Sequence, residues 1–187
     1  MRLRRVRKRA PKCGFMPVAD SRLSIICADI TQLDVDAIVN AANAELAGGG
    51  GVDGAIHRAA GPGLMQACQQ IGGCPTGSAV LTAGFDLPAR HVIHAVGPIW
   101  QGGGQNEAEL LASCYRTCME LAQQHQLQSI AFSAISCGVY GFQIEQAASI
   151  AVTTVAEHLI NNPQLQQVQF VCFGEAVEAA YRQALGV

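Results

Sequence analysis

The amino-acid sequence predicts an α/β fold, with a three-layer α/β/α arrangement around a central mixed, largely parallel sheet. The first observation is that short apolar runs alternate along the chain with longer segments whose apolar residues recur at helical spacing. The second is that 187 residues, half of them hydrophobic and 14% charged, can bury one sizeable core. We therefore expect one globular domain over residues 20–187, after a basic leader over residues 1–19.

Strands are predicted where a short apolar run ends in a turn that contains glycine or polar residues. Ligands of open α/β sheets bind beyond the C-terminal ends of the strands, so the glycine-bearing loops that follow strands are where a site is expected. The predicted strands cover residues 23–27, 36–40, 78–84, 91–97, 129–135 and 168–174.

Helices are predicted from apolar periodicity and from their start and stop signals. Gly61 and Pro62 end one helix and start the next, which ends at Gly72 and Gly73. Asn106 is of the residue type that caps helix N-termini, and it precedes the longest helical segment. The predicted helices cover residues 54–61, 62–71, 106–125, 145–160 and 175–185.

The formal charge of −2 conceals an asymmetric distribution. Most of the 12 basic residues lie before position 13, whereas all 14 acidic residues follow it. Such an acidic body is not typical of a nucleic-acid binder, so we expect nucleic acid not to be a partner. A phosphorylated ligand would have to be held by backbone N–H groups and helix N-termini. The basic residues that remain in the body are Arg22, Arg58, Arg90, Arg116 and Arg182.

The leader has three interpretations: a disordered extension, a basic arm for nucleic acid or an anionic membrane, and an organelle-targeting segment. The first is favoured, because the leader is poor in Ser and lacks the apolar region of a secretion signal. No apolar run approaches the roughly 18 residues of a membrane span, so we do not expect the chain to enter a membrane. We expect the protein to be a monomer in the cytoplasm.

The eight cysteines and five histidines do not follow a metal-ligand or disulfide spacing. Cys27 and Cys172 lie in apolar runs and are expected to be small core residues. His91 and His94 are an odd number of residues apart on one predicted strand, which places them on opposite faces. We expect His57 to be a structural residue next to the site and not a general base. We expect the site to need no metal ion or cofactor.

Gly49, Gly51 and Gly54 match the G-x-G-x-x-G pattern of dinucleotide-binding proteins, but the context does not fit. In that fold the glycines come directly after a strand, and an acidic residue follows about 20 positions later. Here the glycines begin well after the predicted strand, and no acidic residue stands at that spacing. The P-loop lysine is absent as well. The glycines still permit close backbone approach to a phosphate.

The combination of motifs around these glycines resembles the macrodomain family, in particular its MacroD-type branch. The resemblance extends from about Leu23 to the C-terminus, with Ala28 and Gln143 in positions where the family usually has Gly and Pro. The motifs are Asp29–Thr31, Asn40–Asn43, Gly48–His57, Cys74–Gly77, Val92–Pro98 and Ser136–Phe142.

The resemblance implies a cleft for ADP-ribose at the C-terminal edge of the sheet. Asp29 would bind the adenine amino group beside the backbone of Ile30, and Asn40 and Asn43 would bind ribose hydroxyls. The loop of Gly49, Gly50, Gly51 and Val52 would enclose the diphosphate together with a second loop, while Phe142 and Tyr140 would pack near the distal ribose. The second loop comprises Ser136, Cys137, Gly138, Val139 and Tyr140.

The activity that the resemblance implies is hydrolysis of esters at the distal ribose, namely mono-ADP-ribosylated Asp or Glu and O-acetyl-ADP-ribose. Asn43 and Asp53 would be the catalytic pair, with Asp53 as base or orienter of a water molecule, a role in which phosphate oxygens of the substrate are the alternative. Asp53 is also of the type that caps the following helix. The alternatives are a non-catalytic ADP-ribose reader and a phosphatase for ADP-ribose 1″-phosphate. The expected partners are ADP-ribose and ADP-ribosylated proteins.

Overall fold

The computed structural model describes residues 20–187, so the predicted leader at residues 1–19 lies outside the described residues. A six-stranded sheet has the order β1-β6-β5-β2-β4-β3. Only β3 is antiparallel, paired with β4 at one edge, which confirms the mixed, largely parallel sheet. The strands are β1 (Leu23–Ile26), β2 (Ala37–Ala41), β3 (Ser78–Ala83), β4 (His91–Val96), β5 (Ser129–Phe132) and β6 (Gln167–Val171).

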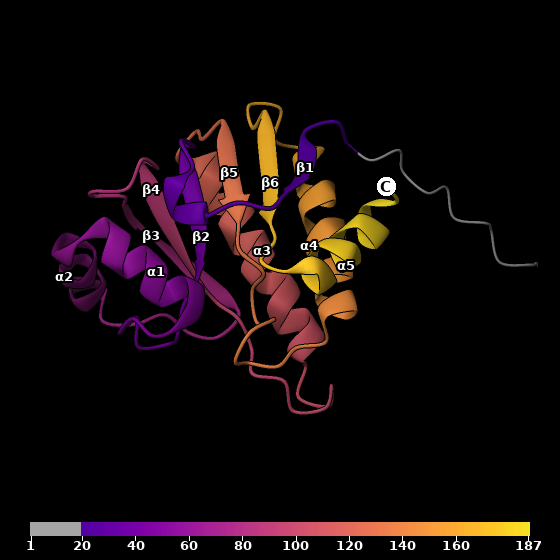
Figure 1. The fold of residues 1–187 in the computed structure, drawn as a ribbon, viewed down its shortest axis with the longest axis horizontal. Helices are drawn as coiled ribbons and strands as arrows, with labels where there is room; N and C mark the ends of the chain where they lie inside the picture. Colours follow the sequence, from indigo (N-terminus) through magenta and orange to yellow (C-terminus); the bar gives the residue numbers. More distant parts are fainter. Residues whose placement is uncertain (1–19) are drawn as a thin grey trace, which may run out of the picture.

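The helices cover both faces of this sheet, as Figure 1 shows, and complete the three layers. On one face lie α1 (Gly51–Ala60) and α2 (Pro62–Ile71). The other face carries α3 (Glu107–Gln124), α4 (Ile144–Leu159) and α5 (Glu175–Leu185). The predicted helices and strands are therefore all present, with small differences at their ends.

Alternation along the strands divides the apolar core into two parts, because successive side chains of a strand point to opposite faces. On β2, Ala37 and Val39 pack toward α3 and α4, while Ile38 packs toward α1 and α2. The same rule separates two histidines of β4: His91 approaches His125 beyond α3, and His94 faces the α1 and α2 layer. The predicted placement of His91 and His94 on opposite faces is confirmed.

Asn106 stands at the N-cap position of α3 as predicted, although its φ of 62° is left-handed and its side chain makes no capping bond. Two other sequence expectations about local structure are wrong, namely that Asp53 caps α1 and that Cys27 is a core residue. The N-cap of α1 is Gly50, and Asp53 is the third residue of the helix. The buried carboxylate of Glu107 accepts N–H groups of Gln101, Gly103 and Gln105 and so holds the preceding loop. Cys27 is exposed because β1 ends at Ile26, whereas Cys172 is buried as expected.

The fold brings the C-terminal ends of the five parallel strands to one edge of the sheet, which is the lower edge in Figure 1. The glycine-bearing loops after β2 and β5 leave the sheet at this edge. Within residues 20–187, no helix combines the length and the apolar character required to cross a membrane.

Candidate functional site

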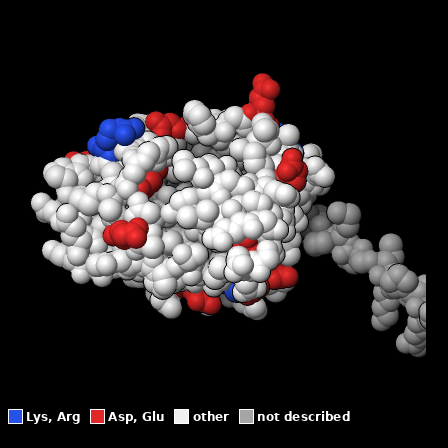
Figure 2. Space-filling view, turned by 90° about the horizontal axis from the view of Figure 1, so that it is seen from below, with Lys and Arg blue, Asp and Glu red and all other residues white. Residues whose placement is uncertain are grey.

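A cavity of about 1010 Å³ lies at this edge of the sheet, between the loops that follow β1, β2, β5 and β6. Its volume is at the upper end of the roughly 300–1,000 Å³ of small-molecule sites. Figure 2 views the molecule from this side, and the surface is mostly uncharged, with scattered acidic side chains and few basic ones. An anionic ligand bound here must therefore rely on backbone N–H groups.

The first wall of the cavity is the glycine loop that leads into α1. Gly50 is the N-cap of this helix, so the free N–H groups of its first turn, at Gly51 to Asp53, stand at the cavity. The helix dipole adds a partial positive charge at the same point. Gly54 allows the loop to fold back, because a Cβ there would collide with the carbonyl oxygen of Gly49. The loop is thus suited to hold phosphate.

The opposite wall is formed by the loop after β5. Ser136 has a φ of 64°, and its backbone carbonyl accepts the N–H of Phe142, which closes the loop. Among the described residues, the N–H groups of Gly138, Val139 and Tyr140 donate to no partner. The Tyr140 carbonyl accepts the N–H of Trp100, so this wall is tied to the loop before α3. Both walls of the cavity therefore offer free N–H groups as hydrogen-bond donors.

Asp53 lies between the glycine loop and the sheet, and only 8% of its side chain is exposed. Its Oδ1 atom accepts a hydrogen bond from Asn40 Nδ2 at 2.6 Å and lies 3.5 Å from His57 Nε2, one helical turn further along α1. Its Oδ2 atom lies on the side of Gly49, which lines the cavity. One carboxylate oxygen is therefore anchored, and the other remains for a ligand or a water molecule.

Asn43 follows β2 and holds the start of the glycine loop. Its Nδ2 donates to the Gly48 carbonyl at 2.7 Å, and its Oδ1 accepts the N–H of Ala47 at 3.0 Å. Asp29 has a similar local role, since its Oδ1 accepts both the N–H and the hydroxyl of Thr31. Both side chains line the cavity while they shape its loops.

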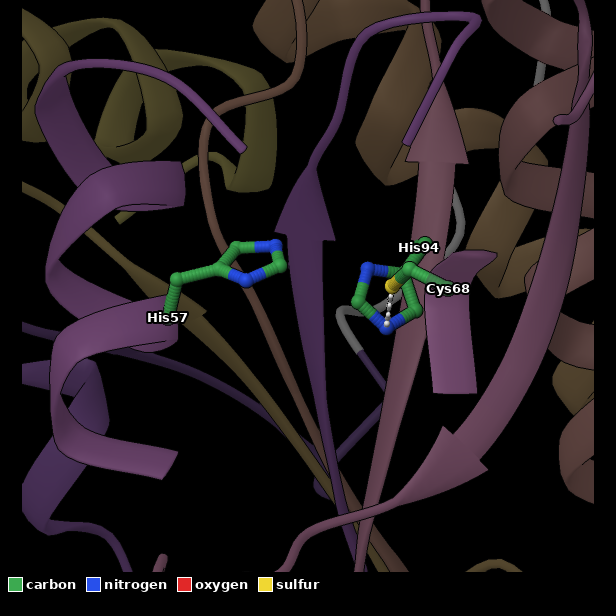
Figure 3. A group of neighbouring side chains, drawn as sticks. All are labelled: His57, Cys68 and His94. Carbon is green, nitrogen blue, oxygen red and sulfur yellow. Dashed lines mark hydrogen bonds between the residues drawn. The ribbon is translucent and has the colours of Figure 1, made fainter. Parts of the chain in front are cut away.

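Behind Asp53, two histidines and a cysteine come together between the sheet and the helices α1 and α2. Figure 3 shows His57 on α1, His94 on β4 and Cys68 on α2 beside His94. The planes of the two imidazole rings are 50° apart. Burial, and then the neighbouring His57, lower the pKa of His94 to about 4, so its ring is neutral at physiological pH. A neutral imidazole is both a donor and an acceptor of hydrogen bonds.

The spacing of cysteines and histidines in the sequence does not indicate a metal-ligand cluster, but the fold brings three such residues together. The ligand atoms of His57, Cys68 and His94 all lie within 4.8 Å of one another. However, the Nε2 atom of His94 that faces Cys68 at 3.8 Å is already 3.0 Å from Thr82 Oγ1, and Nδ1 is bonded to Asn40. A metal ion would have to displace one of these bonds. Of the three side chains, His94 and Cys68 are in hydrogen-bond contact, whereas the His57 ring packs against His94 and approaches Asp53.

Comparisons with known proteins agree with this architecture. The family model described as the Macro domain matches residues 39–151, which is more than half of the chain. A Salmonella newport protein named "O-acetyl-ADP-ribose deacetylase" is 56% identical over 169 residues, 88% of this chain and 94% of its own length. This chain belongs to the macrodomain family.

Two solved macrodomains have the same fold with a TM-score of 0.85. The macrodomain of Oceanobacillus iheyensis with ADP is 45% identical and is matched over 91% of this chain and 93% of its own. The macrodomain of Trypanosoma brucei in complex with ADP-ribose is 40% identical, over 91% of this chain and 72% of its own.

In this macrodomain, the residues expected at the ligand line the cavity with two exceptions. Asn40 is fully buried and bonds Asp53 and His94, so it does not line the cavity where its bond to ribose was expected. Phe142 is also buried and packs on Trp100 with ring centroids 4.7 Å apart. The residues that do line the cavity are Asp29, Ile30, Asn43, Gly49, Gly50, Gly51, Val52, Asp53, Ser136, Cys137, Gly138, Val139 and Tyr140.

Sequence reasoning missed the part of the macrodomain cavity beyond β6. Phe173 lines it with 96% of its surface exposed, beside Gly174 and Val177 at the start of α5. The signal was present in the apolar run VQFVCFG, whose glycine marks a third loop at the C-terminal end of a parallel strand.

Cys137 is the thiol in the second loop that a nucleophilic mechanism would use. Its burial raises the pKa of the thiol to about 11, so it is protonated at neutral pH. A protonated thiol is a poor nucleophile, so Cys137 is better suited to shape the loop than to attack a substrate.

Proposed function

We propose that this macrodomain binds ADP-ribose and hydrolyses esters of its distal ribose, in O-acetyl-ADP-ribose and in proteins mono-ADP-ribosylated on Asp or Glu. The observation that carries the proposal is the carboxylate of Asp53, with Oδ1 held by Asn40 and Oδ2 beside Gly49 at the cavity. The name of the Salmonella relative and the ligands of the two solved macrodomains support the same substrate class.

The two loops supply what an ADP-ribose diphosphate requires. The N-terminus of α1 and the free N–H groups of Gly138 to Tyr140 face each other across the cavity, and both offer donors without basic side chains. Asp29, beyond β1, would accept from the adenine amino group, and Phe173 offers an exposed ring near that end. The distal ribose would then lie toward Asn43 and Asp53.

The chemistry follows from the free oxygen of Asp53. In ester hydrolysis, a water molecule loses a proton and attacks the acyl carbon, and the ribose oxygen leaves with a proton. Oδ2 of Asp53 would orient that water and accept its proton, a role that typically contributes about 10²–10⁴-fold to the rate. Asn43 would hold the loop at Ala47 and Gly48 so that Gly49 stays against the carboxylate. The N–H groups of the loops would stabilise the developing negative charge.

Compartment and partners are proposed on the same basis. The described cysteines are free thiols, which fits a reducing compartment such as the cytoplasm. ADP-ribosylated proteins are the proposed macromolecular substrates.

The test is hydrolysis of O-acetyl-ADP-ribose and of a glutamate-ADP-ribosylated protein, compared between the wild type and Asp53→Ala, with ADP-ribose affinity measured by calorimetry. The matched control is Asp34→Ala, an exposed acid in the turn before β2, at the opposite edge of the sheet. We expect Asp53→Ala to lose most of its turnover and to keep ADP-ribose binding, while Asp34→Ala matches the wild type.

Other outcomes would overturn the proposal. A wild type that binds ADP-ribose but releases neither product is a reader. A wild type that releases phosphate from ADP-ribose 1″-phosphate and leaves both esters intact is a phosphatase.

A further inference from the structure

Three polar side chains of neighbouring strands form a buried row beneath the proposed catalytic site. Asn40 on β2 is paired in register with His94 on β4, and Thr82 on the adjacent β3 pairs with Val92 two residues before His94. All three point to the face that α1 and α2 cover, and each is at most 6% exposed. Buried polar groups are generally hydrogen-bonded, and in this row Asn40 Oδ1 is the one side-chain atom without a partner among the described residues.

The row ends on the carboxylate of Asp53. Asn40 Nδ2 lies 2.6 Å from Asp53 Oδ1 and 3.2 Å from His94 Nδ1. At the other end, His94 Nε2 lies 3.0 Å from Thr82 Oγ1, whose hydroxyl donates to the Val92 carbonyl at 3.5 Å. Strand β3, which does not line the cavity, is thus connected to the carboxylate through His94 and Asn40.

Donor and acceptor chemistry gives this row one direction. The amide nitrogen of Asn40 can only donate, and a reversed amide would set its oxygen against the carboxylate of Asp53. Nδ1 of His94 must therefore be unprotonated, and its proton is on Nε2. Because the Thr82 hydroxyl proton points to Val92, Thr82 Oγ1 is free to accept the proton of His94 Nε2.

We propose that His94 is a positioning residue for Asp53, because its Nδ1 holds the Asn40 amide in the orientation that fixes Asp53 Oδ1. This role rests on the proposed hydrolase function, in which the free Oδ2 of Asp53 acts on water. His94 does not line the cavity. Without it, the Asn40 amide can rotate, and the carboxylate loses its fixed angle to the distal ribose.

Two substitutions of His94 separate positioning from packing. In His94→Asn, the side-chain oxygen occupies the place of Nδ1 and can still accept from Asn40. His94→Gln reaches toward Thr82 but has no acceptor at the place of Nδ1. Since a displacement of about 1 Å can cost on the order of 10²-fold in rate, we expect kcat to fall ~10²-fold in His94→Gln and less than ~10-fold in His94→Asn. ADP-ribose affinity should be unchanged in both.

Thr82 supplies a second pair of variants, remote from the cavity. Thr82→Val removes the acceptor for Nε2–H, so that the His94 proton can move to Nδ1 and oppose the Asn40 amide. Thr82→Ser keeps the hydroxyl and serves as the control. We expect kcat to fall about 10-fold in Thr82→Val and to stay near the wild type in Thr82→Ser, since correct alignment of the reacting group is what the row provides.

Nitrogen-15 NMR of the apo protein gives a readout that does not depend on turnover. The wild type should show a neutral His94 protonated at Nε2 and an Asn40 side-chain amide protected from solvent exchange, and Thr82→Val should lose both signatures. If the wild type turns over but His94→Gln and His94→Asn lose kcat equally, in proportion to their melting temperatures, the positioning role is wrong. A His94 protonated at Nδ1 in the wild type overturns it as well. If the wild type hydrolyses no ester, the proposed function fails, and the spectra alone decide whether His94 fixes Asn40.

Discussion

Gly49 lies directly against the carboxylate of Asp53: a Cβ on Gly49 would stand 3.1 Å from Asp53 Oδ2 and 3.8 Å from Asn43 Nδ2. The carboxylate cannot move away freely, because Asn40 holds its other oxygen. The backbone of Gly49 does not have a positive φ, so its small size, and not its conformational freedom, is what the site requires.

Gly49→Ala should therefore lower kcat/KM for O-acetyl-ADP-ribose by about 10–10²-fold, since it displaces the reacting carboxylate. The matched control is Gly50→Ala, where a Cβ meets no atom within 4 Å and φ is −95°. Steady-state kinetics and a melting curve of each variant provide the measurement. Equal values of kcat/KM for the two variants would show that a side chain at position 49 does not displace the carboxylate of Asp53.

His94 predicts a pH dependence of stability. Its pKa is lowered from 6.5 to about 4 in the folded protein, so the unfolded chain binds the proton first as the pH falls. The contribution of neutral His94 to the free energy of unfolding is fully present above pH 6.5. It is lost as the pH falls toward 4, by up to about 3 kcal/mol for a shift of this size. The charged and titratable neighbours are Asp53 and His57 on α1 and Cys68 on α2.

The measurement is chemical denaturation of the wild type and of His94→Asn between pH 7 and pH 4.5. The free energy of unfolding of the wild type should fall more steeply than that of the variant, and the difference between the two slopes isolates His94. Parallel curves would mean that His94 has the same pKa in the folded and the unfolded protein, so that its burial does not affect its protonation.

The elements of the fold were predictable from the sequence because their signals are local. Gly61 and Pro62 mark the boundary between α1 and α2, where Gly61 has a φ of 74° and Pro62 is the first helical residue. The glycine loop was predictable as part of the ligand cavity for the same reason. Such features depend on a few neighbouring residues, and the backbone there has few alternatives.

The buried row of Asn40, His94 and Thr82 was not predictable, because its members come together only through the pairing register of three strands. Asn40 meets His94 only through the pairing of β2 with β4, and Cys68 joins them from α2. Alternation places Ile38 and Asn40 on the same face of β2, and this could have indicated that Asn40 points beneath α1 instead of into the cavity. The position of Asn40 in its motif, taken alone, favoured a hydrogen bond to the ribose.

The stability of the loop before α3 is expected to depend on the ionised carboxylate of Glu107. Its carboxylate accepts three backbone N–H groups, and although burial opposes its ionisation, these bonds hold its pKa below the ordinary value. Glu107→Gln replaces one acceptor oxygen with a donor and should lower the melting temperature at pH 7. Glu109→Gln, an exposed residue of the same helix, is the control. An unchanged melting temperature in Glu107→Gln would show that the loop is held by other contacts.

Gln143 is the N-cap of α4 and offers a stabilising substitution. Its φ of −63° is the value that proline imposes, and among the described residues its N–H donates to no partner. Gln143→Pro should raise the free energy of unfolding by about 0.4–1 kcal/mol, because it restricts the unfolded chain. For a chain of this size, this corresponds to a rise in melting temperature of roughly 1–4 °C, measurable by calorimetry. Gln143→Ala is the control, since it removes the same side chain without fixing φ. A melting temperature of Gln143→Pro at or below that of Gln143→Ala would mean that Phe142, buried against Trp100, cannot adopt the extended backbone that precedes a proline.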